Sequence, residues 1–64
     1  MDYIARHQFQ DGSSVTLDRA SWGDYTHVVY TTGRNGYTYA IHQFKTESEA
    51  RKGFAAKIED RRHA

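Results

Sequence analysis

Four segments of the chain alternate between apolar and polar side chains with the period of two that is typical of a β-strand. They are residues 3–9, 14–19, 25–32 and 37–44, and the last two are the densest in β-branched and aromatic residues. Asp11-Gly12 lies between the first two segments, and Asn35-Gly36 lies between the last two. Both pairs are strong hairpin signals, so we expect four strands with antiparallel neighbours.

The pattern becomes helical after residue 44. Thr46 and Glu49 form a capping box, in which each side chain satisfies a backbone N–H at the start of a helix. One stripe of the helix carries small and apolar residues with a single lysine: Ala50, Gly53, Phe54, Lys57 and Ile58. A helix over about 47–62 with so few apolar groups needs a sheet to pack against.

These elements predict a single α+β domain over residues 1–64. Its sheet is antiparallel with four strands, or at least three, and one C-terminal helix packs on one face. A chain of 64 residues has a thin core, and without cysteine it has no disulfide to stabilise it. We therefore expect partner binding or self-association, such as a homodimer, to add stability.

The loop of the first hairpin decides which side chains share a face. A two-residue loop places Val15 and Leu17 with the even-numbered residues of segment 3–9. An odd loop, with Gly12 in the left-handed conformation, places them with the odd-numbered ones. The odd loop gathers more apolar area, and we favour the face that it forms: Tyr3, Ala5, Phe9, Val15 and Leu17.

The second hairpin gives two sets of side chains, which are the same for a two-residue and a four-residue loop. One set is Val28, Tyr30, Tyr37, Tyr39 and Ile41; the other is Tyr25, His27, Val29, Thr31, Thr38, Ala40, His42 and Phe44. The first set is more apolar, so we expect it, Tyr37 excepted, to pack under the helix. In the opposite case Val29, Ala40 and Phe44 pack there. Either arrangement leaves an aromatic and polar face open, because one helix covers one face.

The open face and the loops beside it are the predicted binding surface. We expect Trp22 to fold back as a lid over the small core, with an exposed binding anchor as the alternative. Arg34 lies at a hairpin tip, from which a long side chain can reach into a partner. The predicted partner-binding residues are Trp22, Tyr25, His27, Arg34, Tyr37, His42 and Lys45.

Charge and hydropathy exclude several classes of protein. Nine Lys and Arg against eight Asp and Glu give a net charge of +1. That is neither the basic excess of a protein held on nucleic acid by phosphate contacts nor the acidity of a nucleic-acid mimic. No long apolar run follows Met1, so we expect no signal peptide, no membrane span and no membrane partner. The start at Met1, the absence of cysteine and the absence of a tag at Ala64 lead us to expect a complete, cytoplasmic protein.

Candidate chemistry is sparse. His27 and His42 fall opposite each other if the second loop has four residues, but no third ligand has the spacing of a metal site, so we expect no metal and no cofactor. Serine, histidine and aspartate occur without a nucleophile motif, and a chain this small has few residues with which to form an enclosed substrate pocket. We therefore expect no enzymatic activity.

Trp22-Gly23 precedes the strand 25–32, a glycine-containing turn leads to the strand 37–44, and this strand runs into Phe44-Lys45-Thr46-Glu47-Ser48-Glu49-Ala50. This arrangement resembles the AP2 and integrase N-terminal type of DNA-binding domain, whose helix opens with a similar Phe-x-Thr-x-x-Glu-Ala pattern. The resemblance implies a three-stranded sheet with a C-terminal helix. In size and lone-module organisation the chain is also similar to small phage-encoded inhibitors, including anti-CRISPR proteins, which bind a host protein complex.

Taken together, these features predict a non-enzymatic binding protein that docks on a protein partner through an exposed aromatic sheet face, as a phage or mobile-element inhibitor does. The alternative is a nucleic-acid-binding module that uses the three-stranded sheet. Its contacts are Tyr25, His27, Arg34, His42 and Lys45.

Overall fold

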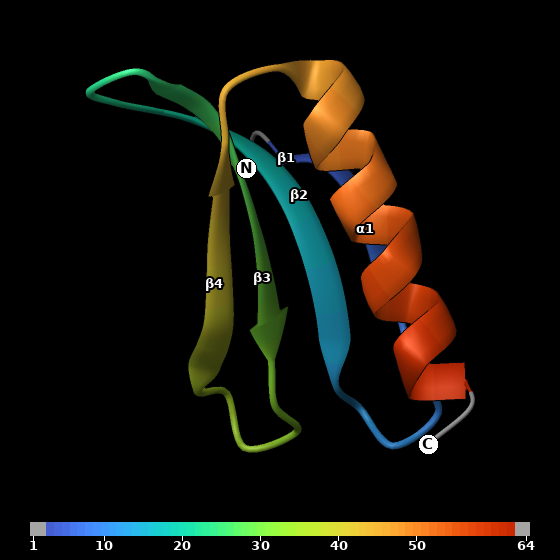
Figure 1. Cartoon of the computed structure of the whole chain (residues 1–64). Helices are drawn as coiled ribbons and strands as arrows, with labels where there is room; N and C mark the ends of the chain where they lie inside the picture. The colour runs from blue at the N-terminus through green and yellow to red at the C-terminus, as the bar shows by residue number, and fades with distance from the viewer. Residues whose placement is uncertain (1–2, 63–64) are drawn as a thin grey trace.

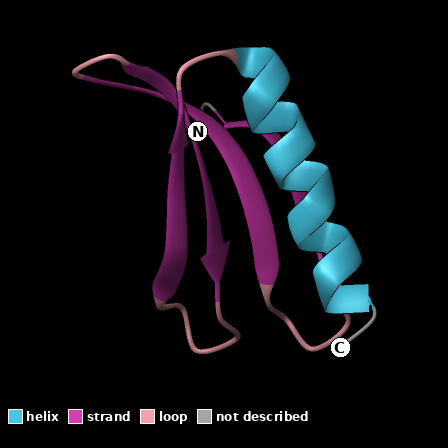
Figure 2. Cartoon of the chain, in the orientation of Figure 1, coloured by secondary structure: helices cyan, strands magenta, loops and turns pink. Residues whose placement is uncertain are grey.

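The computed structural model describes residues 3–62 (Figure 1). Its elements are the strands β1 (Tyr3–Gln8), β2 (Ser14–Trp22), β3 (Tyr25–Thr32) and β4 (Thr38–Phe44) and the helix α1 (Glu47–Arg62). The strands form one antiparallel sheet in the order β1-β2-β3-β4, and α1 lies along one face of it (Figure 2). The predicted fold class, an α+β fold with a four-stranded antiparallel sheet and one C-terminal helix, is confirmed.

The β1–β2 hairpin has the odd loop that the apolar pattern favours. The N–H of Phe9 donates to the carbonyl of Ser13 over 2.8 Å, and Gly12 has a φ of 93°. Glycine adopts this conformation at no steric cost. Leu17 consequently pairs with Ala5 on the same face of the sheet, as predicted.

The first residue of β1 departs from this pattern. A register shift between Tyr3 and Ala5 pairs Tyr3 with Asp18, so Tyr3 lies on the face away from Leu17. The guanidinium carbon of Arg6 lies over the Tyr3 ring, 4.5 Å from its centre. The predicted face for Tyr3 is wrong, because an irregularity in the ladder reverses the direction in which its side chain points.

β2 continues through Trp22 instead of ending near residue 19. A two-residue turn, with Gly23 at a φ of 59°, joins it to β3 and pairs Trp22 with Tyr25. We call residues 20–25 the projecting hairpin, because they extend past β1 and β4 and away from α1 (Figure 1). Trp22 does not cover the core as expected, since 71% of its surface is exposed.

The β3–β4 loop has five residues, 33–37, and neither of the predicted lengths. The N–H of Gly33 donates to the carbonyl of Tyr37 over 2.8 Å, which closes the loop one residue later than a four-residue turn. β4 therefore begins at Thr38. With this odd loop, the faces near the turn are reversed relative to the prediction.

A register shift inside β4 restores the predicted faces farther along the strand. Thr31 pairs with Tyr39, but past the shift Val29 pairs with His42. Ala40 lies at the shift with a φ of 53°, which is uncommon for a residue other than glycine. Tyr39 therefore shares a face with Val29, and the prediction that placed it on the opposite face is wrong.

α1 packs on the face that carries Val29, not on the face expected to form the core. The buried apolar side chains are Val15, Leu17, Val29 and Ala50, and they are ringed by Ile4, Ala5, Phe9, Phe44, Phe54 and Ile58. A Cβ added at Gly53 would overlap the Phe44 ring, so this ring fills the space left by the missing side chain. Since α1 begins three residues after Phe44, the helix closes on the face to which Phe44 points. Val28, Tyr30 and Ile41 lie on the other face, where Ile41 is 59% exposed.

Thr46 caps α1 as predicted. The N–H of Glu49 donates to the Thr46 hydroxyl over 3.2 Å, and that hydroxyl lies 3.5 Å from a carboxylate oxygen of Glu49. Across residues 3–62, no helix has the length and apolar character needed to cross a membrane.

Candidate functional site

The residues predicted to bind a partner do not form one surface. Trp22, Tyr25 and Lys45 lie at the end of the sheet with the projecting hairpin; Arg34 and Tyr37 lie at the opposite end, beside the last turn of α1; His42 is exposed on β4, and His27 is buried. Figure 1 shows the hairpin of residues 20–25 and the β3–β4 loop at opposite ends of the sheet, in a molecule whose longest dimension is 33 Å. Each end is therefore a separate candidate site.

The projecting hairpin presents two aromatic rings. Trp22 and Tyr25 are directly paired across the strands, with 71% and 37% of their surfaces exposed. Paired residues have Cβ atoms about 5 Å apart and point to the same side of the ladder. An indole and a phenol thus stand next to each other in solvent. The exposure of Trp22 agrees with the second alternative, and its role as a binding anchor stays a prediction.

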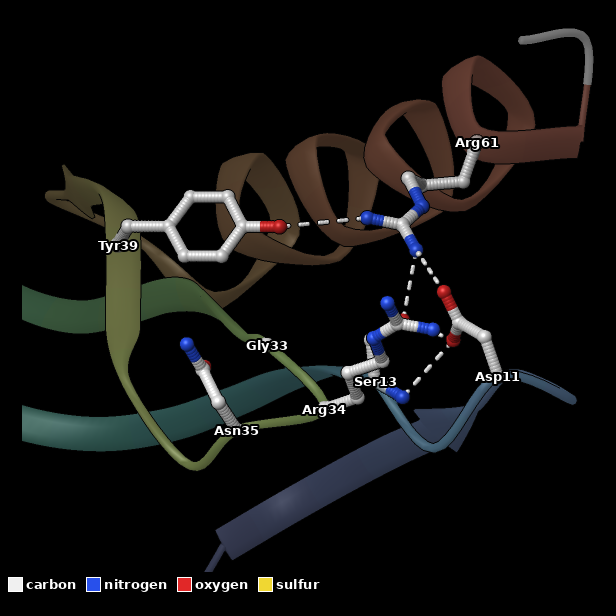
Figure 3. Close-up of a pocket in the computed structure, with 7 residues that line it drawn as sticks. All are labelled: Asp11, Ser13, Gly33, Arg34, Asn35, Tyr39 and Arg61. Atoms are coloured by element: carbon white, nitrogen blue, oxygen red, sulfur yellow. Dashed lines mark hydrogen bonds and ion pairs between the residues drawn. The ribbon is translucent and has the colours of Figure 1, made fainter.

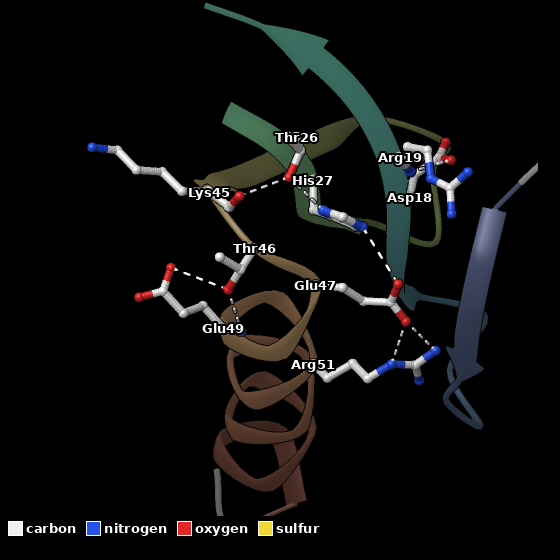
Figure 4. A network of polar contacts seen from close by, with 9 residues as sticks. All are labelled: Asp18, Arg19, Thr26, His27, Lys45, Thr46, Glu47, Glu49 and Arg51. Carbon is white, nitrogen blue, oxygen red and sulfur yellow. Dashed lines mark hydrogen bonds and ion pairs between the residues drawn. The ribbon is translucent and has the colours of Figure 1, made fainter. Parts of the chain in front are cut away.

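His27 is buried at the base of this hairpin, with 8% of its surface exposed, so its predicted exposure is wrong. The Thr26 hydroxyl donates to the carbonyl of Lys45 over 2.9 Å and therefore accepts from Nδ1 of His27, 2.7 Å away (Figure 4). Nε2 is buried without a hydrogen bond to the described residues and lies 3.8 Å from a carboxylate oxygen of Glu47. His27 links β3 to the start of α1 and is not a surface contact.

Glu47 is the acidic group of that junction. The guanidinium of Arg51 lies 2.7 Å from the Oε2 atom of Glu47 through Nη2 and donates to it from Nε over 2.8 Å. This hydrogen-bonded ion pair lowers the pKa of Glu47, and the charges of His27 and Arg19 act in the same direction. The pair holds the first turn of α1, where a negative charge also complements the helix dipole.

The opposite end of the sheet holds a polar recess of about 320 Å³ (Figure 3). The β1–β2 loop, the β3–β4 loop, the start of β4 and the last turn of α1 line it with Asp11, Ser13, Gly33, Arg34, Asn35, Tyr39 and Arg61. Oδ1 of Asp11 accepts from the hydroxyl of Ser13 over 2.6 Å and from its N–H over 2.9 Å. These bonds lower the pKa of Asp11, with smaller effects from the charges of Arg61 and Arg34.

Arg61 joins the elements around the recess. Nη2 donates to Oδ2 of Asp11 over 3.2 Å and to Oγ of Ser13 over 2.6 Å, and Nη1 donates to the Tyr39 hydroxyl over 3.3 Å. The guanidinium carbon also lies 4.8 Å from the centre of the Phe9 ring. Arg61 is thereby held in one orientation at the wall of the recess.

Arg34 is the second cation of the recess. Its side chain is exposed and points toward the Asp11 carboxylate (Figure 3), whose pKa its charge helps to lower. With the residues from 3 to 62 it forms neither a hydrogen bond nor an ion pair within 4 Å. The sequence identified Arg34 from its place in a hairpin loop but missed Asp11 and Arg61. Those two are 50 positions apart, and no local pattern links them.

Groups of three or more histidine, aspartate or glutamate side chains suited to a metal ion are absent from the described part of the chain. His27 pairs with Phe44 and His42 pairs with Val29, so the two imidazoles predicted to face each other do not. The five-residue loop and the shift in β4 account for this difference.

Comparison of the chain with models of known protein families, with curated proteins and with solved structures finds no match.

Proposed function

We propose that the chain is a non-enzymatic binding protein that docks on another protein through the projecting hairpin and occludes the surface it covers. The observation that supports this most is Trp22, 71% exposed on a two-stranded hairpin that reaches beyond the body of the fold. Burying a large apolar side chain stabilises a complex by about 1.5–3 kcal/mol, and in the free chain Trp22 is left in water.

The composition of the hairpin fits a protein partner. Trp and Tyr are enriched among the residues that dominate interface energetics, since each buries a large area at a small cost in side-chain entropy. Lys45 adds a cation at the hairpin base, where its carbonyl accepts from Thr26. Arg19 is a second exposed cation on β2, before the hairpin. We infer a partner with an apolar pocket for the indole and acidic groups around it.

Two other occupants are less well supported. A second copy of the chain offers the recess at the far end as a receptor, but charged and polar groups line it, and they do not suit an indole. The contacts predicted for a nucleic acid are not contiguous, because His27 is buried and Arg34 lies at the end opposite Tyr25.

Trp22 is the only tryptophan of the chain, so the tryptophan emission of the chain reports on the hairpin. Proteins captured on the immobilised chain are purified and titrated with the free chain. Burial of the indole is expected to shift its emission to shorter wavelength. Trp22→Ala is expected to weaken binding by at least about 2 kcal/mol, as for an interface anchor, while thermal unfolding stays nearly unchanged.

Tyr37→Ala is the matched control, because Tyr37 is 74% exposed at the opposite end of the sheet. It is expected to bind the partner as wild type does. Equal losses in the two variants, or a partner that leaves the emission unchanged, contradict the proposal. Saturable binding of random oligonucleotides that is lost as salt rises points to the nucleic-acid alternative, and a shift that depends on the concentration of the chain alone points to a homodimer.

A further inference from the structure

The recess beside the last turn of α1 has two arginines and one carboxylate. Arg61 and Arg34 face Asp11 there, and the neighbouring Arg62 is paired with Glu59 over 3.4 Å. The lining therefore keeps an excess of one positive charge. The C-terminal carbonyls of α1 oppose an anion, and Arg61 and Arg62 offset their partial charge.

The strongest acceptor of the recess is already occupied. Oδ1 of Asp11 accepts two hydrogen bonds from Ser13, and Oδ2 accepts one from Arg61. The Tyr39 hydroxyl accepts from Arg61, which leaves its own O–H to donate.

The β3–β4 loop supplies further donors. Oδ1 of Asn35 accepts from the N–H of Tyr37 over 3.3 Å, so the amide NH₂ of Asn35 is the group left to donate. Arg34 adds a guanidinium that has no hydrogen bond to the described residues. The side-chain groups still available around the recess are therefore donors, and they come from the β3–β4 loop and β4, beside Arg61 of α1.

We propose that this recess binds a phosphate group, as the free ion or as a monoester, between Arg34 and Arg61. A tetrahedral oxyanion accepts hydrogen bonds from several directions at once, which matches donors placed on separate elements, and guanidinium groups pair well with phosphate oxygens. The volume is sufficient, because five heavy atoms need only a few times the roughly 30 Å³ of one water molecule. Because exposed residues such as Asp11, Arg34 and Asn35 line the recess, we expect weak binding, with a dissociation constant on the order of millimolar.

The test is a titration of ¹⁵N-labelled protein with inorganic phosphate at constant ionic strength set with sodium chloride, followed by two-dimensional NMR. Saturable shifts are expected at residues 11–13 and 33–36. Arg34→Gln is expected to weaken binding roughly tenfold through the loss of a charge-assisted contact. Asp11→Asn keeps an acceptor for Ser13 but removes the opposing charge, so it is expected to tighten binding several-fold.

Arg51→Gln is the matched control, because it removes the same charge from the opposite end of α1. It is expected to leave the phosphate affinity unchanged, as is Trp22→Ala, which separates this site from the proposed protein contact. A parallel titration with a phosphate monoester tells which form the recess prefers, and saturation by either form supports the proposal. Shifts that chloride alone reproduces, an equal loss in Arg51→Gln, or tighter binding of acetate than of phosphate would overturn it.

Discussion

The face of the sheet under α1 and the face turned away from it bury their side chains in different ways. Under the helix, close packing buries Val15, Leu17 and Val29. On the open face Thr16 is also fully buried, although no helix packs there. Arg6 donates to the Thr16 hydroxyl from Nε over 3.1 Å, and Tyr30 pairs with Thr16 from the neighbouring strand.

The difference shows that long amphipathic side chains lying along a sheet can cover its centre without a second layer. Arg6 is paired with Thr16 across the strands, and its guanidinium carbon lies over the Tyr3 ring, 4.5 Å from the ring centre. Side chains that cover the centre of the open face leave its edge strand β4 exposed, and Ile41 on this strand is 59% exposed. We infer that the helix face supplies most of the stability and that the open face tolerates change.

Removing an aliphatic side chain from each face gives the largest contrast. Leu17→Ala is expected to cost about 2–5 kcal/mol, because Leu17 is completely buried under α1. A chain of 64 residues has a total stability of roughly 3–10 kcal/mol, so this variant is close to unfolding. Ile41→Ala on the open face is expected to cost about 0.5 kcal/mol or less. Urea unfolding measures both, and equal losses would show that the open face is packed as tightly as the other.

A methyl group at position 53 tests how closely α1 approaches the sheet. Gly53→Ala gains about 1 kcal/mol of helix propensity, but its Cβ meets the Phe44 ring. Overpacking costs about 1–3 kcal/mol, so we expect a net loss of stability. Ala55→Gly, at an exposed position of the helix, measures the propensity term alone. A more stable Gly53→Ala protein means that Phe44 does not pack against this turn.

Acidification gives the smallest effect and acts at the two ends of α1. Hydrogen bonds from Ser13 lower the pKa of Asp11, and the bond from Arg51 lowers that of Glu47. A carboxyl group with a lower pKa in the folded state stabilises the fold above its unfolded pKa, about 4, and loses this contribution as the pH falls through its folded pKa. The melting temperature is therefore expected to decrease as the pH is lowered below about 4.

Isosteric neutral variants test whether these two carboxylates cause the loss of stability in acid. The double variant Asp11→Asn/Glu47→Gln is expected to melt at a lower temperature than wild type near neutral pH, and its melting temperature is expected to fall less steeply on acidification. Asp24→Asn, in the turn of the projecting hairpin, is the control and is expected to keep the wild-type profile. A fall of the same steepness in all three proteins would mean that other groups govern the acid transition.

Features that depend on near neighbours could be predicted from the sequence. Asp11-Gly12 with the apolar residues on either side indicated the odd first loop and hence the face shared by Val15 and Leu17. Thr46 and Glu49 marked the first turn of the helix. The candidate sites were predicted only in part. Trp22 and Arg34 were both among the predicted partner-binding residues, but Trp22 was expected to cover the core, and the sequence did not show that the two stand at opposite ends of the sheet.

By itself, the sequence determined the order of the elements, the antiparallel hairpins and the start of the helix, because turns and caps are set by residues a few positions apart. Only the tertiary structure decided which face α1 covers, where the ladder of β4 shifts and how the recess is assembled. Those features rest on contacts between distant parts of the chain, such as Phe44 against Gly53 and Arg61 against Asp11. Small differences in packing decide such contacts, and alternation of apolar and polar residues does not record them.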